Sequence, residues 1–244
     1  MRQFNKLFVI ALPRCATVSM CDALGELGVR TAHLGRIYGE ASNEHNNPTR
    51  LKRMHDQISQ GDFALEILDE CRGLADYPAC SFQVYTELDK QYPDSLFINV
   101  RRDQDKQRWI QSVERQFVGL QLLKAGRQST EEEQRFMQVM LSFREMTFGQ
   151  SNFDAAAYLR AYDEYQQQVT DYFAGRKMQL LDLDSIQTLE STGFSELCRF
   201  LEVDPVDKPF PRSNAHSELP TKLFMQALED ESITSQTGIK PVSC

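Results

Sequence analysis

The stretch Leu7-Phe-Val-Ile-Ala-Leu-Pro-Arg-Cys-Ala-Thr-Val-Ser-Met20, continued by Cys-Asp-Ala-Leu-Gly-Glu-Leu-Gly28, decides the fold of this chain. Its uncharged apolar run from Leu7 to Leu12 has the length of a strand that is buried on both faces of a parallel sheet. Beyond Pro13, apolar residues recur at helical spacing up to Gly28, a residue type that commonly ends helices. The stretch therefore predicts a strand, a tight polar turn and a helix.

The turn between this strand and this helix has the chemistry of an anion site. The first N–H groups of a helix have no partner inside the helix, and they lie at the positive end of its dipole. Arg14, Thr17 and Ser19 add a cation and two hydroxyl donors to these N–H groups. We therefore expect the turn to bind a phosphate group. The alternative is an ordinary structural turn with an incidental arginine.

The turn does not have the pattern of an ATPase loop. A Walker loop needs glycines and a lysine followed by a serine or threonine, which hold the phosphates and magnesium. This turn contains no glycine, and no lysine follows it. Hydrolysis of ATP or GTP is therefore disfavoured, although a nucleotide kinase or NTPase on the same scaffold remains an alternative.

Length and composition fit one soluble α/β domain that covers residues 1–244, with a loosely ordered tail at 225–244. The chain has 244 residues, of which 41% are hydrophobic and 25% charged, values that are ordinary for globular proteins. A net charge of −8 argues against non-specific binding to nucleic acid or to an anionic membrane. A polyanionic cofactor would then need cations that are clustered locally.

The sequence shows no targeting segment, membrane span or metal motif. No apolar run approaches membrane-spanning length, and the first six residues do not resemble a signal peptide. The six cysteines, at positions 15, 21, 71, 80, 198 and 244, form no Cys-x-x-Cys pair, and no histidine stands at zinc spacing. We expect a cytoplasmic protein with reduced thiols and no metal ion.

Further strands and helices alternate along the chain, which predicts a three-layer sandwich with a central parallel sheet between helices. Residues 96–100 form a second buried strand in this prediction, residues 178–184 a third, and residues 29–34 a short one. Helices are predicted over 51–59 and 192–201, and a further helix opens within 75–80, with Pro78 in its first turn, and runs through Leu88. The segment 129–173 is predicted to form two helices that break near Gly149, with a serine or asparagine capping the second. The aromatic stripe of that segment is predicted to be core.

Two arginines follow the strand at 96–100. Ligands of open parallel sheets bind beyond the carboxyl ends of the strands, and Arg101 and Arg102 stand at this end. Ser112 lies on the helix that follows. An arginine fork and a serine hydroxyl can bind a second phosphate. A solvated pair of arginines is the alternative.

Asp76 and His33 are the candidate proton acceptors. Asp76 precedes Pro78 and a predicted helix, so it is either the cap of that helix or a carboxylate near the mouth of the sheet that accepts a proton from a substrate hydroxyl. His33 stands at the end of a predicted strand. It either faces the site or is a hydrogen-bonded edge residue.

The stretch Pro13-Arg-Cys-Ala-Thr-Val-Ser19 resembles the 5′-phosphosulfate loop of P-loop sulfotransferases, usually Pro, Lys or Arg, Ser or Thr, Gly, Thr, and Thr or Ser. Cys15 and Ala16 depart from the usual hydroxyl residue and glycine, which predicts a tighter loop because alanine disfavours positive φ. The resemblance extends over most of the chain, through Asp76-Tyr-Pro-Ala79, Tyr92-Pro-Asp94, Arg101-Arg-Asp103, Trp109 to Ser112, Leu180-Leu-Asp-Leu183, Glu196-Leu-Cys-Arg-Phe-Leu201 and Pro209-Phe-Pro-Arg-Ser-Asn214.

This resemblance implies a P-loop NTPase-like sulfotransferase architecture. It also implies metal-independent transfer of a sulfuryl group from 3′-phosphoadenosine 5′-phosphosulfate (PAPS) to a hydroxyl or amine of a small-molecule or glycan acceptor, with adenosine 3′,5′-bisphosphate (PAP) as product. Carried over by position, the 5′-phosphosulfate is held by Arg14, Cys15, Ala16, Thr17, Val18 and Ser19. Arg101 or Arg102, with Ser112, holds the 3′-phosphate, and the uninterrupted match from Pro93 favours Arg102. Arg212, with Asn214, matches a further family feature that we expect to bind cofactor.

The resemblance also assigns chemical roles. Arg14 would stabilise the leaving 5′-phosphate, and the acceptor proton would pass to Asp76 as first candidate or to His33 as second. A non-catalytic relative that keeps the fold and the nucleotide site is the main alternative, suggested by Cys15 and Ala16.

Overall fold

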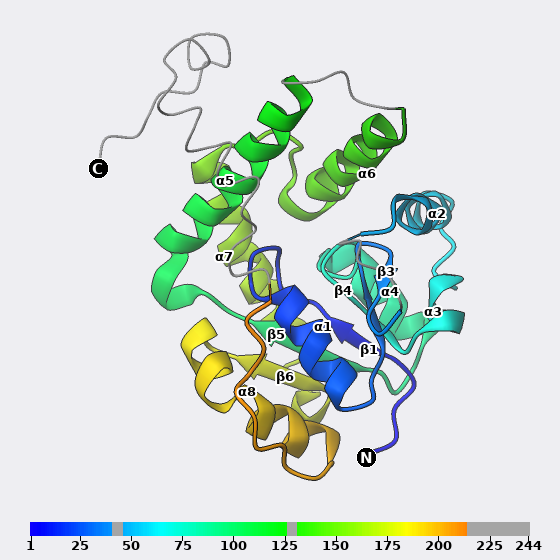
Figure 1. Cartoon of the computed structure of the whole chain (residues 1–244), viewed down its shortest axis with the longest axis vertical. Coiled ribbons are helices and arrows are strands. Elements are labelled where there is room, and N and C mark those ends of the chain that lie inside the picture. Colours follow the sequence, from blue (N-terminus) through cyan, green and yellow to red (C-terminus); the bar gives the residue numbers. More distant parts are fainter. Residues whose placement is uncertain (41–45, 126–130, 214–244) are drawn as a thin grey trace.

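The computed structural model describes residues 1–40, 46–125 and 131–213 (Figure 1). The predicted loose tail at 225–244, Asn214 and Cys244 lie outside these residues. Over the described residues, strands and helices alternate along the chain, as the sequence predicts.

The described strands form one sheet in the order β3-β2-β4-β1-β5-β6. Their bounds are β1 Leu7–Val9, β2 Thr31–His33, β3 Arg36–Ile37, β4 Gly73–Ala75, β5 Leu96–Val100 and β6 Leu180–Leu183. Every pairing is parallel except that of β3, which runs antiparallel to β2. Because β1 lies between β4 and β5, the loop after β1 emerges in the middle of the sheet edge where the parallel strands end.

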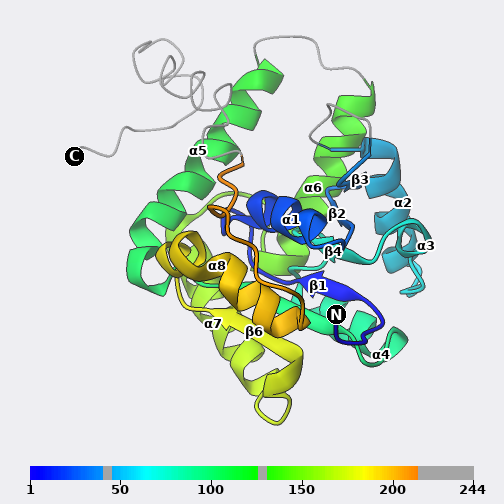
Figure 2. The ribbon, with the colours of Figure 1, turned by 60° about the horizontal axis from the view of Figure 1, so that its bottom comes forward.

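Helices cover both faces of the sheet and one of its ends. Their bounds are α1 Thr17–Glu26, α2 Pro48–Ser59, α3 Ile67–Glu70, α4 Phe82–Gln91, α5 Lys106–Ala125, α6 Glu131–Phe148, α7 Ala155–Tyr172 and α8 Ile186–Leu201. Figures 1 and 2 show α1 and α8 on one face of the sheet and α4 and α7 on the other. This arrangement confirms the predicted α/β class with a central, mostly parallel sheet between two layers of helices.

Local sequence signals explain several of the helix ends. Gly28 has φ +79° and its N–H donates to the carbonyl of Gly25, so it ends α1 in the conformation that glycine favours. Pro48 opens α2 behind the capping side chain of Asn47. The predicted break near Gly149 is confirmed, but the cap of α7 is Asp154 rather than a serine or asparagine.

The aromatic stripe of α6 and α7 belongs to the core, as predicted. Phe143, Tyr158 and Tyr162 are fully buried. Trp109 of α5 packs against Tyr162 at a centroid distance of 4.8 Å. These helices are therefore fixed against the end of the sheet near the loop that follows β1.

Strand β4, like the short elements β3 and α3, was missed by the sequence analysis. It has only three residues, too few to show a periodicity, yet it lies between β2 and β1. A Cβ atom at Gly73 would lie 1.8 Å from the carbonyl oxygen of Leu7. Only glycine therefore allows β4 to approach β1 so closely. The prediction for 178–184 also needs correction, because β6 is an edge strand and only Leu183 is buried.

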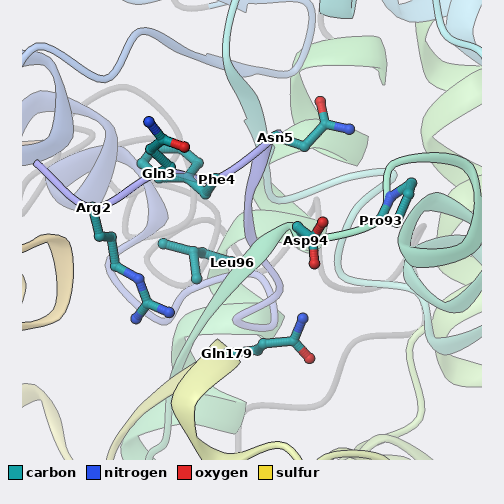
Figure 3. Close-up of a pocket in the computed structure, with 8 residues that line it drawn as sticks. All are labelled: Arg2, Gln3, Phe4, Asn5, Pro93, Asp94, Leu96 and Gln179. Atoms are coloured by element: carbon teal, nitrogen blue, oxygen red, sulfur yellow. The ribbon is translucent and has the colours of Figure 1, made fainter.

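A surface pocket lies at the opposite edge of the sheet (Figure 3). It is lined by residues that include Arg2, Phe4, Asp94 and Gln179, which precede β1, β5 and β6. Ligands of parallel sheets bind beyond the carboxyl ends of the strands. This pocket, at the amino ends, is therefore not the site that the sequence predicts. Among the described residues, no helix has the length and hydropathy needed to span a membrane.

Candidate functional site

The loop between β1 and α1 turns through two left-handed residues. Arg14 has φ +69° and Ala16 has φ +58°. Ala16 is the N-cap of α1, and no side chain caps this helix end. The N–H groups of the first turn therefore have neither a partner inside the helix nor a side-chain cap. The loop takes the conformation that a glycine would favour, although an alanine occupies the position.

Three side chains from distant segments hold this loop through its carbonyl groups. Tyr165 donates its hydroxyl to the carbonyl of Ile10 at 2.6 Å, and the indole of Trp109 donates to the carbonyl of Pro13 at 3.0 Å. Arg102 donates to the carbonyl of Arg14 at 3.2 Å. Because these three carbonyls accept hydrogen bonds from the protein, the conformation of the loop is fixed before any ligand binds.

Replacing Ala16 with glycine is expected to stabilise the protein. A left-handed conformation costs an alanine about 1–2 kcal/mol, and the greater freedom of glycine in the unfolded chain offsets about 0.4–1 kcal/mol of the gain. We expect Ala16→Gly to raise the free energy of unfolding by about 0.5–1 kcal/mol in urea denaturation. The control Ala161→Gly, inside α7, should lower it by about 1 kcal/mol. A loss of stability in both variants would contradict the left-handed conformation of Ala16.

Arg14 is the central cation of this loop. Its Nε donates to Ser112 Oγ at 2.9 Å, so the predicted Ser112 does lie at the site. Among the described residues, no carboxylate forms a salt bridge with Arg14. Burial lowers the pKa of Arg14, the nearby Asp76 opposes this effect, and the neighbouring guanidinium groups of Arg115 and Arg102 lower the pKa further.

Arg14 and Arg102 thus meet at one helix end in a chain of net charge −8, and Arg115 is near enough to lower the pKa of Arg14. Arg115 was not predicted. It stands three residues after Ser112, which places both on the same face of α5. That spacing is the signal that could have identified it, once Ser112 was a candidate. Such a cluster of cations is suited to a polyanion.

The structure separates the two adjacent arginine candidates. Arg101 binds Asp182 with both Nε, at 3.0 Å, and Nη2, at 2.6 Å, and it also donates to Thr170. Its side chain is therefore engaged at β6 and α7. Arg102 lies beside the loop, where it contacts the carbonyl of Arg14 and forms an ion pair with Asp105.

Asp76 is brought to the loop by the unpredicted strand β4. The residue follows this strand with φ +62°. Its Oδ2 accepts a hydrogen bond from the hydroxyl of Thr17 at 2.8 Å, and its Oδ1 accepts one from the N–H of Tyr77 at 2.8 Å. The Nε2 of His33, at the end of the neighbouring strand β2, lies 3.3 Å from Oδ2. Asp76, His33 and Thr17 therefore form one buried cluster.

The expectation that Asp76 and Pro78 begin a helix was wrong. Helix α4 begins at Phe82, and its N-cap is Ser81. Asp76 does not cap this helix, since its carboxylate is bound to the cluster described above. The alternative, a carboxylate at the mouth of the sheet, is the placement that the structure shows.

The carboxyl of Asp76 should make stability depend on pH below about pH 4. Burial alone would raise its pKa, but hydrogen bonds from His33, Thr17 and the N–H of Tyr77 outweigh burial and lower it. A folded-state pKa below the unfolded value of about 3.9 gives stability that is complete above that value and is lost as pH falls through the folded pKa. In acid titrations followed by circular dichroism, wild type should lose stability more steeply than Asp76→Asn. Equal slopes would contradict the lowered pKa.

The side chains of the remaining loop candidates are bonded or buried within the protein. The hydroxyl of Thr17 donates a hydrogen bond to the carboxylate of Asp76. That of Ser19 is bonded to the backbone of Ser213, whose N–H donates to it at 3.0 Å. Cys15 is fully buried, and burial raises the pKa of its thiol to about 12, so the thiol stays neutral. Val18, which is partly buried, is apolar.

Arg212 does not join the arginine cluster in this structure. Its guanidinium pairs with Glu190 at 2.9 Å, and 69% of its side chain is exposed. The segment that contains it nevertheless reaches the loop, through the bonds between Ser213 and Ser19. Among the described residues, no group of three or more His, Cys, Asp or Glu side chains is arranged to hold a metal ion. The five described cysteines are free thiols.

Known proteins resemble this chain over most of its length. A family profile described as a sulfotransferase domain matches residues 6–219. No curated protein sequence matches the chain. Among solved structures, a sulfotransferase from Alicyclobacillus acidocaldarius is similar at 15% identity and a TM-score of 0.43. The aligned region covers 99% of this chain and 98% of the chain of that sulfotransferase. The family profile spans nearly the whole chain and every site residue described above, so the chain belongs to the sulfotransferase domain family.

Proposed function

We propose that this protein transfers a sulfuryl group from PAPS to a hydroxyl or amine of a small-molecule or glycan acceptor. The observation that carries the proposal is the placement of Arg14 and Arg102 at the uncapped end of α1, beside the buried pair of Asp76 and His33. Membership of the family supports the reaction class. The reaction that the family resemblance implies needs no metal, and we propose a cytoplasmic location.

The residues at this helix end fit a donor with two phosphate groups. The N–H groups of the first turn of α1 and the guanidinium of Arg14 would hold the 5′-phosphosulfate. Arg102, with Ser112 and Arg115, would hold the 3′-phosphate. When bound, the donor supplies the sulfuryl group and leaves as PAP. Arg14 would stabilise the negative charge that develops on the 5′-phosphate.

Within this proposal, His33 rather than Asp76 accepts the proton of the acceptor. Asp76 accepts hydrogen bonds from Thr17 and from the N–H of Tyr77, and Nε2 of His33 lies 3.3 Å from its Oδ2, which makes its carboxylate a weak base. When Nε2–H of His33 donates to Asp76, the neutral ring carries an unprotonated Nδ1. This Nδ1 is buried and has no hydrogen-bond partner among the described residues. Asp76 would then orient the imidazole and stabilise its protonated form.

Transfer from a sulfur-labelled donor to a panel of hydroxyl and amine acceptors tests the proposal. Labelled product from any acceptor, lost in His33→Gln, would support it. PAP binding without transfer to any acceptor would favour the non-catalytic relative instead. The hydroxyls of Thr17 and Ser19 are engaged within the protein, which is the observation that favours this second candidate.

A further inference from the structure

Helix α7, on the face of the sheet opposite α1 (Figures 1 and 2), presents two buried tyrosines to the two loops of the proposed donor site. Tyr162 and Tyr165 stand three residues apart, which places them on one face of the helix. Tyr165 donates its hydroxyl to the carbonyl of Ile10, which directly follows β1. The hydroxyl of Tyr162 accepts a hydrogen bond at 2.6 Å from the backbone N–H of Arg102, in the turn after β5. One helix therefore contacts both loops to which the proposed function assigns a phosphate group.

The hydroxyl of Tyr162 both accepts and donates in the turn after β5. Besides accepting from the N–H of Arg102, it donates to Oδ1 of Asp103 at 3.0 Å. Tyr162 is fully buried, and burial raises the pKa of its hydroxyl, so the group stays protonated and keeps its ability to donate. Two consecutive residues of the turn are thus bound by one side chain of another helix.

The ring of Tyr162 is also fixed in place. It packs against the indole of Trp109 at a centroid distance of 4.8 Å, and that indole donates to the carbonyl of Pro13 in the loop after β1. The ammonium group of Lys106 lies over the Tyr162 ring, 5.5 Å from its centroid. The hydroxyl is therefore carried by a side chain that is packed on several sides.

The turn held by Tyr162 determines where the guanidinium of Arg102 lies. Its Nε donates to Oδ1 of Asp105 at 3.0 Å, but Asp105 belongs to the same turn and would move with it. Its Nη1 donates to the carbonyl of Arg14 at 3.2 Å, the contact that joins the turn to the loop after β1. Tyr162 holds the turn from outside, so a shift of the turn in its absence would displace Arg102 relative to Arg14.

We propose that Tyr162 is a positioning residue, which sets Arg102 for the 3′-phosphate of the donor and so makes the site prefer a nucleotide with that phosphate. Tyr162 does not touch the nucleotide in this proposal and acts through Arg102. The inference rests on the proposed function, because it concerns the donor of that reaction. Tyr162→Phe keeps the ring and removes only the hydroxyl, which frees the N–H of Arg102 and the carboxylate of Asp103 from this partner.

Calorimetric titration with PAP and with adenosine 5′-monophosphate (AMP), which lacks the 3′-phosphate, tests this proposal. Wild type should bind PAP at least about tenfold more tightly than AMP. Loss of one hydrogen bond in Tyr162→Phe should reduce this preference about five- to tenfold, with the affinity for AMP kept within about twofold. Retained AMP binding also shows that the variant is folded.

Tyr165→Phe is the matched control, because it also removes one hydroxyl bond between α7 and a backbone group, but at the loop after β1. It should weaken PAP and AMP alike and keep the preference between them. Tyr85→Phe removes a buried hydroxyl that has no partner among the described residues, and it should change neither affinity. An unchanged preference in Tyr162→Phe, or an equal loss of preference in Tyr165→Phe, would overturn the inference.

A double variant separates positioning from a purely structural role. Since Tyr162 acts through Arg102, Tyr162→Phe should cost little further PAP affinity once Arg102→Ala has removed the guanidinium. Additive losses would make Tyr162 a structural residue and overturn the inference. A wild type that binds no PAP would contradict the proposed function and this inference with it. A wild type that prefers PAP, with the same preference in Tyr162→Phe, would contradict this inference alone.

Discussion

Replacing Arg14 with alanine is expected to weaken PAP binding about 10- to 100-fold, because a hydrogen bond to a charged group contributes about 1.5–3 kcal/mol. Arg14 is the cation of the left-handed loop, and no described carboxylate neutralises it. In the proposed complex, removing it would leave the N–H groups of α1 to hold the 5′-phosphate. Calorimetric titration with PAP measures the effect. Arg14→Lys should bind PAP with an affinity between those of wild type and Arg14→Ala, since a lysine keeps the charge but not the planar guanidinium.

The neighbouring arginines supply a matched comparison for this prediction. Arg102→Ala should also weaken PAP binding, because Arg102 lies beside the loop. Arg101→Ala should change it by less than about threefold, since the Arg101 side chain contacts Asp182 and Thr170 rather than the loop. If Arg101→Ala weakened binding more than Arg102→Ala, the assignment of the two residues would be reversed. Unchanged binding in Arg14→Ala would remove the basis of the anion site.

Substitutions in the buried pair should reduce turnover rather than donor binding. General base catalysis contributes about 10²- to 10⁴-fold, so His33→Gln is expected to lower kcat by a factor in that range. Asp76→Asn should lower kcat about as far, because an amide neither fixes the tautomer of His33 nor stabilises its protonated form. Steady-state kinetics with the labelled donor measures kcat, and PAP titration of the same variants reports the donor site separately.

A buried carboxylate elsewhere controls for loss of folding. Asp89 is also buried, where it accepts from Tyr172 and Arg176. Asp89→Asn should lower stability without the loss in kcat that Asp76→Asn shows. Comparable kcat losses in both variants would indicate that the Asp76 effect comes from lost stability and not from proton transfer. If Asp76→Asn lowered kcat but His33→Gln did not, the carboxylate itself would be the base.

The sequence predicted the parts of the site that depend on local signals. The apolar run after Lys6, the turn at Arg14 and the glycine end of α1 are contiguous, so their periodicity and turn chemistry can be seen in one window. Ser112 and Arg102 lie beside this loop, where a strong strand and the family resemblance led us to expect them.

The parts that were missed depend on contacts between distant segments. Strand β4 has three residues and pairs with its neighbours β1 and β2. Three residues are too few to show a periodicity in the sequence. The placement of Asp76 was consequently uncertain between a helix cap and the sheet edge. Arg115 is exposed on α5, and in the sequence only its three-residue spacing from Ser112 could have identified it. The engagement of Thr17 by Asp76 joins residues 59 positions apart.

The departure at Ala16 did not prevent the glycine-like loop. Tertiary contacts from Tyr165, Trp109 and Arg102 fix the loop and outweigh the local preference of alanine. The conformation is therefore kept at a local cost, which is why Ala16→Gly is expected to be stabilising.

Titration of the wild-type protein with PAP, against ATP with magnesium, tests the central claim most directly. The arginine cluster and the absence of a Walker lysine predict that PAP binds at least tenfold more tightly than ATP, and that magnesium does not improve its binding. Tighter binding of ATP that depends on magnesium would contradict the account and favour a kinase or NTPase. Binding of neither nucleotide would mean that the loop after β1 is not a donor site.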